Sequence, residues 1–416
     1  MNNLLQLNSI TASAGDPGRQ KGRPAFRIPE LYVGRLHLTD FRSYGRVTLA
    51  PEGRSVVLTG PNGAGKTNIL EALSFLSPGR GLRGCKLSEV SHLNGRPAAR
   101  RDWAVAARLE TPDGSTDLGT GLAAGSGTAA EEMAADGGQK DRRIVRIDGE
   151  NAAGPAVFGD ILQVAWLTPQ MDRLFIEAAS GRRRFLDRIV ASFHSSHNRE
   201  VNAFERVMRE RNRLLLDGGH DSAWLSALES RMAEHGVAVA AARLDAMDRL
   251  AGAIDKATSC FPRATLAVEG LLEEGLMAGP AIEVEDHFRR VLRDNRPEDS
   301  RSGRAAAGPH KSDLLVRHRD KDMPAALCST GEQKALLIGI TLASARITAA
   351  SFGVAPILLL DEVVAHLDRE RRASLYDELA ALGSQLWLTG TDRLLFDELG
   401  DRARYYRVEN SSITDE

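Results

Sequence analysis

Residues 60–67 constrain the fold of this 416-residue chain more than any other segment. They match the pattern G-x-x-x-x-G-K-[ST] at every fixed position, after a strand-like run at 55–59 and before a helical run at 67–76. A strand, a glycine-rich turn and a helix in this order form a loop whose backbone N–H groups face phosphate oxygens, and the helix adds its positive dipole end. The candidate phosphate-binding residues are Gly60, Pro61, Asn62, Gly63, Ala64, Gly65, Lys66 and Thr67.

The last two residues of this motif have distinct expected roles. Lys66 is expected to reach the β- and γ-phosphates as a mobile point charge and to assist catalysis, while the Thr67 hydroxyl is expected to bind Mg²⁺. The alternative is a chance glycine turn before a helix. The lysine, the hydroxyl residue and both flanking elements favour a true phosphate loop, and the predicted cofactors are ATP and Mg²⁺.

A second motif is acidic and follows a buried strand. Pro356 precedes four aliphatic residues at 357–360, and the run ends in Asp361 and Glu362. Such a run is typical of a strand buried on both faces, and open α/β sheets bind ligands at the carboxyl ends of these strands. Asp361 is expected to orient Mg²⁺ and Glu362 to polarise the attacking water. The alternative is a strand that merely ends in solvated acids.

Residues 329–333 read Ser-Thr-Gly-Glu-Gln and precede a helical stretch at 334–349. Ser329 and the Gly331 amide therefore lie at a helix N-terminus, which suits an anion. The segment resembles the signature motif of ABC-type ATPase heads, where the signature of one subunit closes over the γ-phosphate held by another. A serine that only caps its helix is the alternative, and Thr330 stands where that motif has glycine.

Three shorter segments extend this resemblance. Residues 365–368 resemble the D-loop that aligns two ABC-type subunits, and Gln170 resembles the Q-loop glutamine, which senses Mg²⁺, assists catalysis and joins the head to an inserted domain. The final predicted strand, in 385–392, has no histidine where transporter ATPases usually carry a switch histidine. Thr389 or Thr391 is expected to take part of that role, and the absence disfavours a transporter subunit.

Together these segments resemble the RecF family of bacterial DNA repair proteins, relatives of the SMC chromosome proteins. The resemblance spans about residues 34–408 and rests on segments 36–44, 66–73, 167–170, 182–188, 308–314 and 329–333. It implies an α/β fold, with a P-loop ABC-type ATPase head built on a mixed sheet, and it places Arg42 and Ser43 near the nucleotide. Where the family often has two aspartates, this chain has Asp361 and Glu362, which leaves the hydrolysis rate open.

Composition agrees with a soluble cytoplasmic protein of more than one lobe. The chain is 42% hydrophobic and 26% charged, and its three cysteines show neither zinc-site nor C-x-x-C spacing, so reduced thiols are expected. No apolar run approaches the roughly twenty residues that cross a bilayer. Residues 1–28 lack a signal-peptide apolar stretch and are expected to form a flexible tail.

Net charge does not by itself indicate DNA binding, because Lys and Arg number 54 against 56 Asp and Glu, a total of −2. A nucleic-acid surface must therefore be local. Residues 181–213 hold nine arginines against four acids, and a second basic group follows the phosphate-loop helix. A solvated helix face is the common alternative for such a run, and the family resemblance favours DNA. The candidate DNA-binding residues are Arg182, Arg183, Arg184, Arg80 and Arg83.

Periodic apolar residues predict a helical arm inserted in the head. Two helices of about 35 residues, joined by a turn at 217–221, would form an antiparallel hairpin that reaches about 50 Å. Residues 111–142 and 295–308 are predicted as long surface connections. The predicted divisions are a tail at 1–28, the N-terminal half of the head at 29–170, the arm lobe at 171–295 and the C-terminal half of the head at 296–416.

The sequence thus predicts an ATP-dependent DNA clamp that dimerises when ATP bridges the phosphate loop of one copy and the signature of the other. A slow, DNA-modulated ATPase that acts as a switch is expected. The resemblance implies duplex DNA near single-strand gaps, cooperation with RecR and RecO, and help with RecA loading in gap repair and the SOS response. The alternatives are a transporter ATPase subunit, an SMC-like structural protein and, more weakly, a small-molecule kinase.

Overall fold

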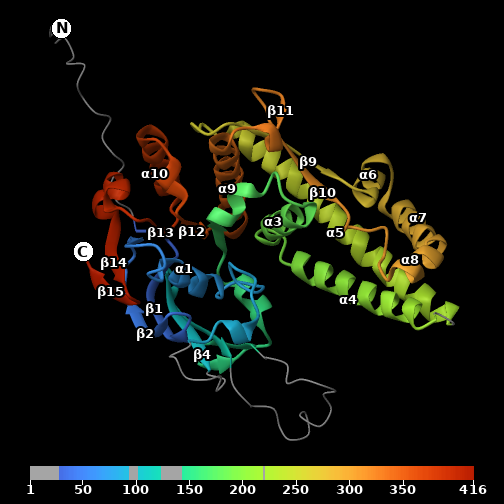
Figure 1. Cartoon of the computed structure of the whole chain (residues 1–416), viewed down its shortest axis with the longest axis horizontal. Helices are drawn as coiled ribbons and strands as arrows, with labels where there is room; N and C mark the ends of the chain where they lie inside the picture. The colour runs from blue at the N-terminus through green and yellow to red at the C-terminus, as the bar shows by residue number, and fades with distance from the viewer. Residues whose placement is uncertain (1–27, 93–101, 123–142, 219–220) are drawn as a thin grey trace, which may run out of the picture.

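The structure is a computed structural model that describes residues 28–92, 102–122, 143–218 and 221–416, and its strands form three sheets (Figure 1). The strands are β1 (Tyr32–Phe41), β2 (Tyr44–Leu49), β3 (Ser55–Thr59), β4 (Trp103–Thr111), β5 (Gly114–Leu122), β6 (Arg143–Ile147), β7 (Glu150–Asn151), β8 (Val164–Leu167), β9 (Ala264–Glu269), β10 (Asp313–His318), β11 (Met323–Pro324), β12 (Ile357–Asp361), β13 (Leu386–Thr389), β14 (Ala403–Glu409) and β15 (Ser412–Asp415). The α-helices are α1 (Lys66–Ser74), α3 (Ala179–Ala191), α4 (His197–Leu216), α5 (Ser222–Lys256), α6 (Leu271–Ala278), α7 (Ala281–Asp294), α8 (Arg296–Ser302), α9 (Thr330–Phe352) and α10 (Arg369–Leu382).

The head is built on a mixed sheet in the order β15-β14-β3-β13-β12-β8, which we call the head sheet. Its strands pair in parallel except for β15, which is antiparallel to β14. The apolar runs of β3, β12 and β13 are buried throughout, as expected for parallel strands covered on both faces. The predicted α/β head with a mixed sheet is therefore confirmed.

Different layers cover the two faces of the head sheet. One hydrophobic core joins α1 and the antiparallel outer sheet, β2-β1-β4-β5-β6-β7, to one face, through residues such as Leu36, Ile69 and Leu359. The other core joins α3, α5, α9 and α10 to the opposite face, through residues such as Leu250, Leu337 and Leu360. Because these layers cover the two faces of the head sheet, the edge at the carboxyl ends of its parallel strands is left for a binding site.

The helical lobe extends from the head and has its own core (Figure 1). Helices α4, α5, α6 and α7 bury apolar residues there, among them Phe204, Met232 and Phe288. Helix α5 has 35 residues and is therefore about 52 Å long. The second limb of the predicted hairpin is confirmed.

The first limb of the predicted hairpin is wrong as a single helix, because it consists of α3 and α4 with a break at 192–196. Ser192, the C-cap of α3, donates its hydroxyl to the Ile189 carbonyl at 2.7 Å and lies 2.9 Å from the Thr348 hydroxyl on α9. Serine side chains compete with the backbone for hydrogen bonds and favour helix ends. The break thus fastens α3 to the head, while α4 continues into the lobe.

Three further predictions about elements are corrected. Residues 296–302 form α8, which packs on α4, so the helical lobe includes part of the segment predicted as a surface connection at 295–308. Residues 114–122 form β5, while 123–142 and the predicted tail through residue 27 lie outside the described residues. The strand predicted as the last, now β13, is followed by β14 and β15.

Within the described residues, α9 alone is long and apolar enough, by length and composition, to cross a membrane. Of its most apolar window, 67% is buried inside the protein. Residues Leu336, Ile338 and Ala343 of α9 belong to the core beneath the head sheet. The helix is therefore accounted for by packing within the head.

Candidate nucleotide-binding site and nucleic-acid surface

The carboxyl ends of four parallel strands bring the predicted motifs to one edge of the head sheet. Strand β3 leads into the phosphate loop, β12 ends at Asp361, β13 ends at Thr389, and β8 is followed by Gln170 three residues later. Because β13 lies between β3 and β12, Thr389 is placed between the phosphate loop and the acidic motif. This edge is where open α/β sheets bind ligands.

The phosphate loop takes a backbone path that glycine alone accommodates. Gly60, Gly63 and Gly65 have φ values of 137°, 81° and 113°. A Cβ on Gly60 would collide with the Val408 carbonyl oxygen, and one on Gly65 would lie 2.8 Å from the Ser43 hydroxyl. Left-handed backbone and close approach together explain the three glycines.

The Lys66 ammonium is held against the loop itself. It donates to the carbonyl oxygens of Gly60 at 2.6 Å and Pro61 at 2.9 Å, and only 4% of the residue is exposed. Burial lowers the pKa of Lys66, and the negative charges of Glu362 and Asp361 partly offset this. A phosphate on the loop would offer this charge an ionised acceptor, so the residue fits a nucleotide triphosphate.

Two hydroxyl groups converge on Asp361. Thr67 donates to both of its carboxylate oxygens, at 2.9 and 3.1 Å, and Thr389 donates to Oδ1 at 2.7 Å. Hydroxyl and carboxylate oxygens are the hard ligands that Mg²⁺ prefers, so the donor set of Thr67 and Asp361 fits this ion. Thr391, the other residue considered for the switch position, is exposed beyond the end of β13.

Glu362 follows in a strained conformation. Its φ and ψ of 52° and 21° are left-handed, which is uncommon outside glycine. Its backbone N–H donates to the Thr389 hydroxyl at 3.0 Å, so one threonine contacts both acidic residues of the motif. Strain of this kind gathers at functional sites, where it fixes the direction of a side chain.

Tyr44 is a feature of the site that sequence reasoning missed. Its side chain is buried, and among the described residues its hydroxyl has no hydrogen-bond partner. A Cβ on Gly65 would lie 2.7 Å from that hydroxyl, so the group faces the phosphate loop. Burial raises the pKa of Tyr44, which keeps its proton available for donation. An unpaired buried donor beside the loop is a second sign that the site accepts a polar ligand.

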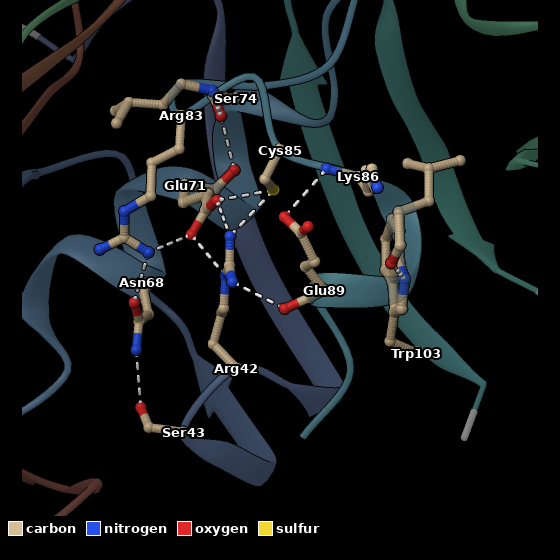
Figure 2. Close-up of polar contacts among 12 residues, drawn as sticks. Arg42, Ser43, Asn68, Glu71, Ser74, Arg83, Cys85, Lys86, Glu89 and Trp103 are labelled. Carbon is tan, nitrogen blue, oxygen red and sulfur yellow. Dashed lines mark hydrogen bonds and ion pairs between the residues drawn. The ribbon is translucent and has the colours of Figure 1, made fainter. Parts of the chain in front are cut away.

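Arg42, which was predicted near the nucleotide, lies in a two-residue turn between β1 and β2, and its guanidinium points to α1 (Figure 2). Its Nε and Nη2 donate to the two carboxylate oxygens of Glu71 at 2.9 and 2.6 Å, and Nη1 donates to the Glu89 carbonyl at 2.7 Å. Burial acts to lower the pKa of Arg42, but Glu71 outweighs it and the pKa is raised. The partner of Arg42 in this structure is therefore Glu71.

The signature segment begins α9 at the surface. Ser329 is the N-cap, its hydroxyl accepts from the Glu332 amide at 3.4 Å, and Glu332 accepts from the Ser329 amide at 2.9 Å. A hydrogen bond from Lys321, followed by those from Ser329, lowers the pKa of Glu332 to about 2. The helix cap considered as an alternative is thus present, and Ser329, Thr330 and Gly331 are nevertheless exposed.

Gln170 lies in a short 3-10 helix, Pro169–Arg173, and is exposed. Asp172 in that helix accepts from Lys334 of α9 at 3.4 Å, which ties the segment after β8 to the signature helix. On the other side, the Arg188 guanidinium of α3 stacks 4.4 Å from the centre of the Trp166 ring on β8. The Gln170 segment therefore joins the head sheet, the signature helix and α3.

The predicted DNA-binding arginines divide into bound and exposed groups. Arg182 donates to both oxygens of Asp313 at 2.7 Å, and Arg183 donates to the Ser312 carbonyl at 2.7 Å. Arg184 is exposed, and among the described residues its one hydrogen bond is to the Ser180 carbonyl of its own helix. On the turn after α1, Arg80 is exposed, while Arg83 donates to Glu71 and Asn68.

Comparison with known proteins places the chain in a family. The family model described as the RecF/RecN/SMC N terminal domain matches residues 32–414. A protein of Allorhizobium ampelinum named DNA replication and repair protein RecF is 47% identical over 388 residues, which cover 92% of this chain and 99% of the relative. One of the same name from Mesorhizobium japonicum is 46% identical over 386 residues, covering 92% and 98%.

Solved structures show the same fold. A structure of the recombination mediator protein RecF with ATP in the RecFOR pathway matches with a TM-score of 0.75 at 18% identity, covering 93% of this chain and 100% of that chain. An Smc head domain from Pyrococcus furiosus matches with a TM-score of 0.50 at 16% identity, covering 93% and 96%. The chain therefore belongs to the RecF family of DNA replication and repair proteins.

Proposed function

We propose that this chain is an ATP-dependent DNA clamp that acts in the repair of single-strand gaps. The observation that carries the proposal is the convergence of Thr67 and Thr389 on Asp361, with Lys66 bonded to the adjoining loop. This arrangement suits a nucleoside triphosphate with Mg²⁺. The ATP-bound RecF structure of the same fold and the names of the curated relatives support ATP as the nucleotide and DNA as the target.

The clamp would form by dimerisation across ATP. Pro61, Asn62 and Gly63 at the tip of the phosphate loop are exposed, and so is the signature start at Ser329 and Gly331. The exposure of both surfaces supports a composite site in which one copy holds the phosphates and the other closes over them. Such a pair has twofold symmetry and two equivalent sites.

Hydrolysis would reopen the clamp. Bound Mg²⁺, held by Thr67 and Asp361 and sensed by Gln170, would supply charge stabilisation to the phosphates. Glu362 would accept a proton from the attacking water, and Lys66 would neutralise charge on the transferred phosphoryl group. We expect slow, DNA-modulated turnover, as suits a switch.

For the DNA surface we propose the exposed arginines of the arm in place of the bound ones. Arg184 on α3 and Arg206 and Arg209 on α4 are exposed, whereas Arg182 and Arg183 contact β10 and the segment before it. Exposed arginines contact phosphates without breaking internal ion pairs. Arg80 on the turn after α1 would add a second contact.

Membership of the family extends the proposal to partners. RecR and RecO, which with RecF make up the pathway named for the solved relatives, would bind the clamp near gaps, and RecA would be loaded there during the SOS response. A cytoplasmic location agrees with this proposed role in DNA repair.

The experiment that tests the proposal measures molar mass by light scattering, with and without ATP and a gapped duplex of about 40 base pairs, which is longer than α5. We expect an ATP-dependent dimer that retains the duplex. The Lys66→Ala variant should stay monomeric under the same conditions. A wild-type protein that binds ATP, remains monomeric and ignores DNA would overturn the clamp.

A further inference from the structure

One buried carboxylate near the phosphate loop serves two arginines (Figure 2). The Glu71 side chain on α1 is fully buried, and it accepts from both Arg42 and Arg83. Two guanidinium groups against one carboxylate leave this cluster with a net positive charge. The Arg83 side chain is 35% exposed, compared with 19% for Arg42, so Arg83 is the partner that an outside anion reaches more readily.

Hydrogen bonds continue from Arg83 to Ser43, which lies beside the phosphate loop. Arg83 also donates to the side-chain oxygen of Asn68 at 2.9 Å, and the Asn68 amide donates to the Ser43 hydroxyl at 2.9 Å. That hydroxyl lies 2.8 Å from where a Cβ on Gly65 would be. Figure 2 shows Ser43, Asn68, Arg83, Glu71 and Arg42 in one connected group.

The other end of this group is a basic turn at the surface. Arg80 and Lys86 are exposed on either side of Arg83. Gly79, Gly81 and Gly84 in the turn have φ values of 96°, 71° and 62°, so its path relies on glycine. The turn therefore presents cations to solvent, and one of them is also bonded to the helix that follows the phosphate loop.

We propose that Arg83 couples DNA to ATP by exchanging Glu71 and Asn68 for a phosphate of the DNA backbone. Before exchange, Arg83 shares Glu71 with Arg42, as described here. After exchange, Arg42 is the sole arginine on Glu71, and the Asn68 amide and Ser43 hydroxyl beside Gly65 are free to rearrange toward bound nucleotide. Arg83, Glu71 and Asn68 are positioning residues in this scheme, which rests on the proposed function.

The test measures how much DNA changes ATP affinity. ATP is titrated with and without a saturating gapped duplex, and the ratio of the two Kd values is the coupling factor, typically about 5- to 150-fold between coupled sites. By linkage, ATP must change DNA affinity by the same factor. For Arg83→Gln we expect a coupling factor near one.

Arg80→Gln is the matched control, because it removes the same charge from the same turn. It should weaken DNA binding and keep the wild-type coupling factor, measured at saturating DNA. An Arg83→Gln protein with the wild-type coupling factor would overturn the proposal. Wild-type protein that failed to bind ATP or DNA would instead refute the proposed function, so the two failures are distinguishable.

Asn68→Ala tests whether coupling passes from Arg83 through Asn68 to Ser43, and it leaves the buried Glu71 carboxylate in place. It removes the amide between Arg83 and Ser43, and α1 should remain folded because alanine favours helix. We expect its coupling factor to fall toward that of Arg83→Gln. An unchanged factor in Asn68→Ala would overturn the route through Ser43.

Discussion

At the scale of single residues, Glu362 combines its proposed role as general base with backbone strain. A left-handed conformation of this kind costs about 1–3 kcal/mol and persists only where surrounding contacts impose it, here the bond from its N–H to Thr389. Because its backbone is held by this bond, the side-chain charge of Glu362 can be removed without changing where the residue lies. The consequence is that chemistry and nucleotide binding can be separated at this position.

We predict that Glu362→Gln slows ATP hydrolysis by about 10²–10⁴-fold, the range for loss of a general base, and leaves an ATP-bound dimer that persists. Turnover assays and light scattering in saturating ATP check the two parts. Glu370→Gln, the same change at an exposed position on α10, should hydrolyse ATP like the wild type. A monomeric Glu362→Gln protein would count against the composite site.

Tyr44 permits a test in which stability and function move in opposite directions. An unsatisfied buried hydroxyl costs about 1–3 kcal/mol, so Tyr44→Phe should raise the free energy of unfolding without nucleotide and weaken ATP binding. Thermal denaturation and ATP titration measure the two effects. Tyr376→Phe is the control, because its hydroxyl donates to the Leu395 carbonyl at 3.0 Å and its loss should destabilise the protein. Destabilisation by both changes would contradict this view of Tyr44.

The sequence could predict the site residues whose roles follow from short motifs. Asp361 ends β12, and Lys66 and Thr67 begin α1 directly after the loop that follows β3, so the motifs alone indicated that they meet. Tyr44 and Glu71 could not be predicted in this way. Their roles arise from contacts with Gly65 and with Arg42, which depend on how β1, β2 and α1 pack.

At the scale of elements, the exposed arginines of the arm are proposed to bind DNA, whereas Arg182 forms an ion pair that stabilises the fold. We predict that Arg184→Glu with Arg206→Glu weakens DNA binding. The slope of log K against log salt concentration should become less steep by about two, since two fewer counterions are released. Affinity measured over a range of salt concentrations gives both values. Arg182→Ala should instead lower the free energy of unfolding by about 0.5–3 kcal/mol, because it breaks the pair with Asp313. Unchanged affinity and slope in the double variant would remove α3 and α4 from the DNA surface.

Asp187 on α3 joins this helix to α4 and α5. It accepts from Arg243 of α5 at 2.9 and 3.0 Å and lies 2.9 Å from His197 of α4. Burial acts to raise the pKa of Asp187, but His197 and Arg243 outweigh it and the pKa is lowered. Because the pKa of Asp187 is lowered in the folded state, the ionised carboxylate stabilises the fold at pH values above its ordinary pKa of 3.8. That stabilisation is lost as the pH falls through the pKa of the folded state.

We therefore predict that Asp187→Asn lowers the free energy of unfolding by about 3–5 kcal/mol near neutral pH, as for a broken buried pair, and by less at pH values below 3.8. Denaturant unfolding at several pH values checks this. Asp320→Asn on an exposed turn is the control and should change little. A loss that grew toward acid pH would contradict the assignment.

Elements with one strong signal were predictable, and those that depend on neighbours were not. The long apolar period of α5 and the aliphatic runs of β3 and β12 indicated these elements directly. The break between α3 and α4 depends on the contact of Ser192 with Thr348, which no local pattern reveals. Helix α7 carries a local signal, the four-residue spacing of its buried residues Val284, Phe288 and Leu292.

At the scale of the whole molecule, the composite site predicts complementation between inactive variants. Lys66→Ala removes the phosphate-loop charge, and Ser329→Arg blocks the exposed signature. In a mixed dimer, one of the two sites would combine an intact phosphate loop with an intact signature. ATPase activity should therefore appear on mixing, although each variant alone is inactive. A mixture as inactive as its components would indicate that each chain works alone.

The order of strands in the head sheet has a consequence for synthesis. Strand β3 lies near the start of the chain, yet both strands that flank it, β13 and β14, lie near its end and are made late. Pairings so distant in sequence form slowly and only once both partners exist. On the ribosome, the outer sheet and the helical lobe can fold while β3 still has an open edge on each side. A nascent chain would thus be unable to shape its phosphate loop until nearly all of it had emerged, which delays nucleotide capture until the protein is almost complete.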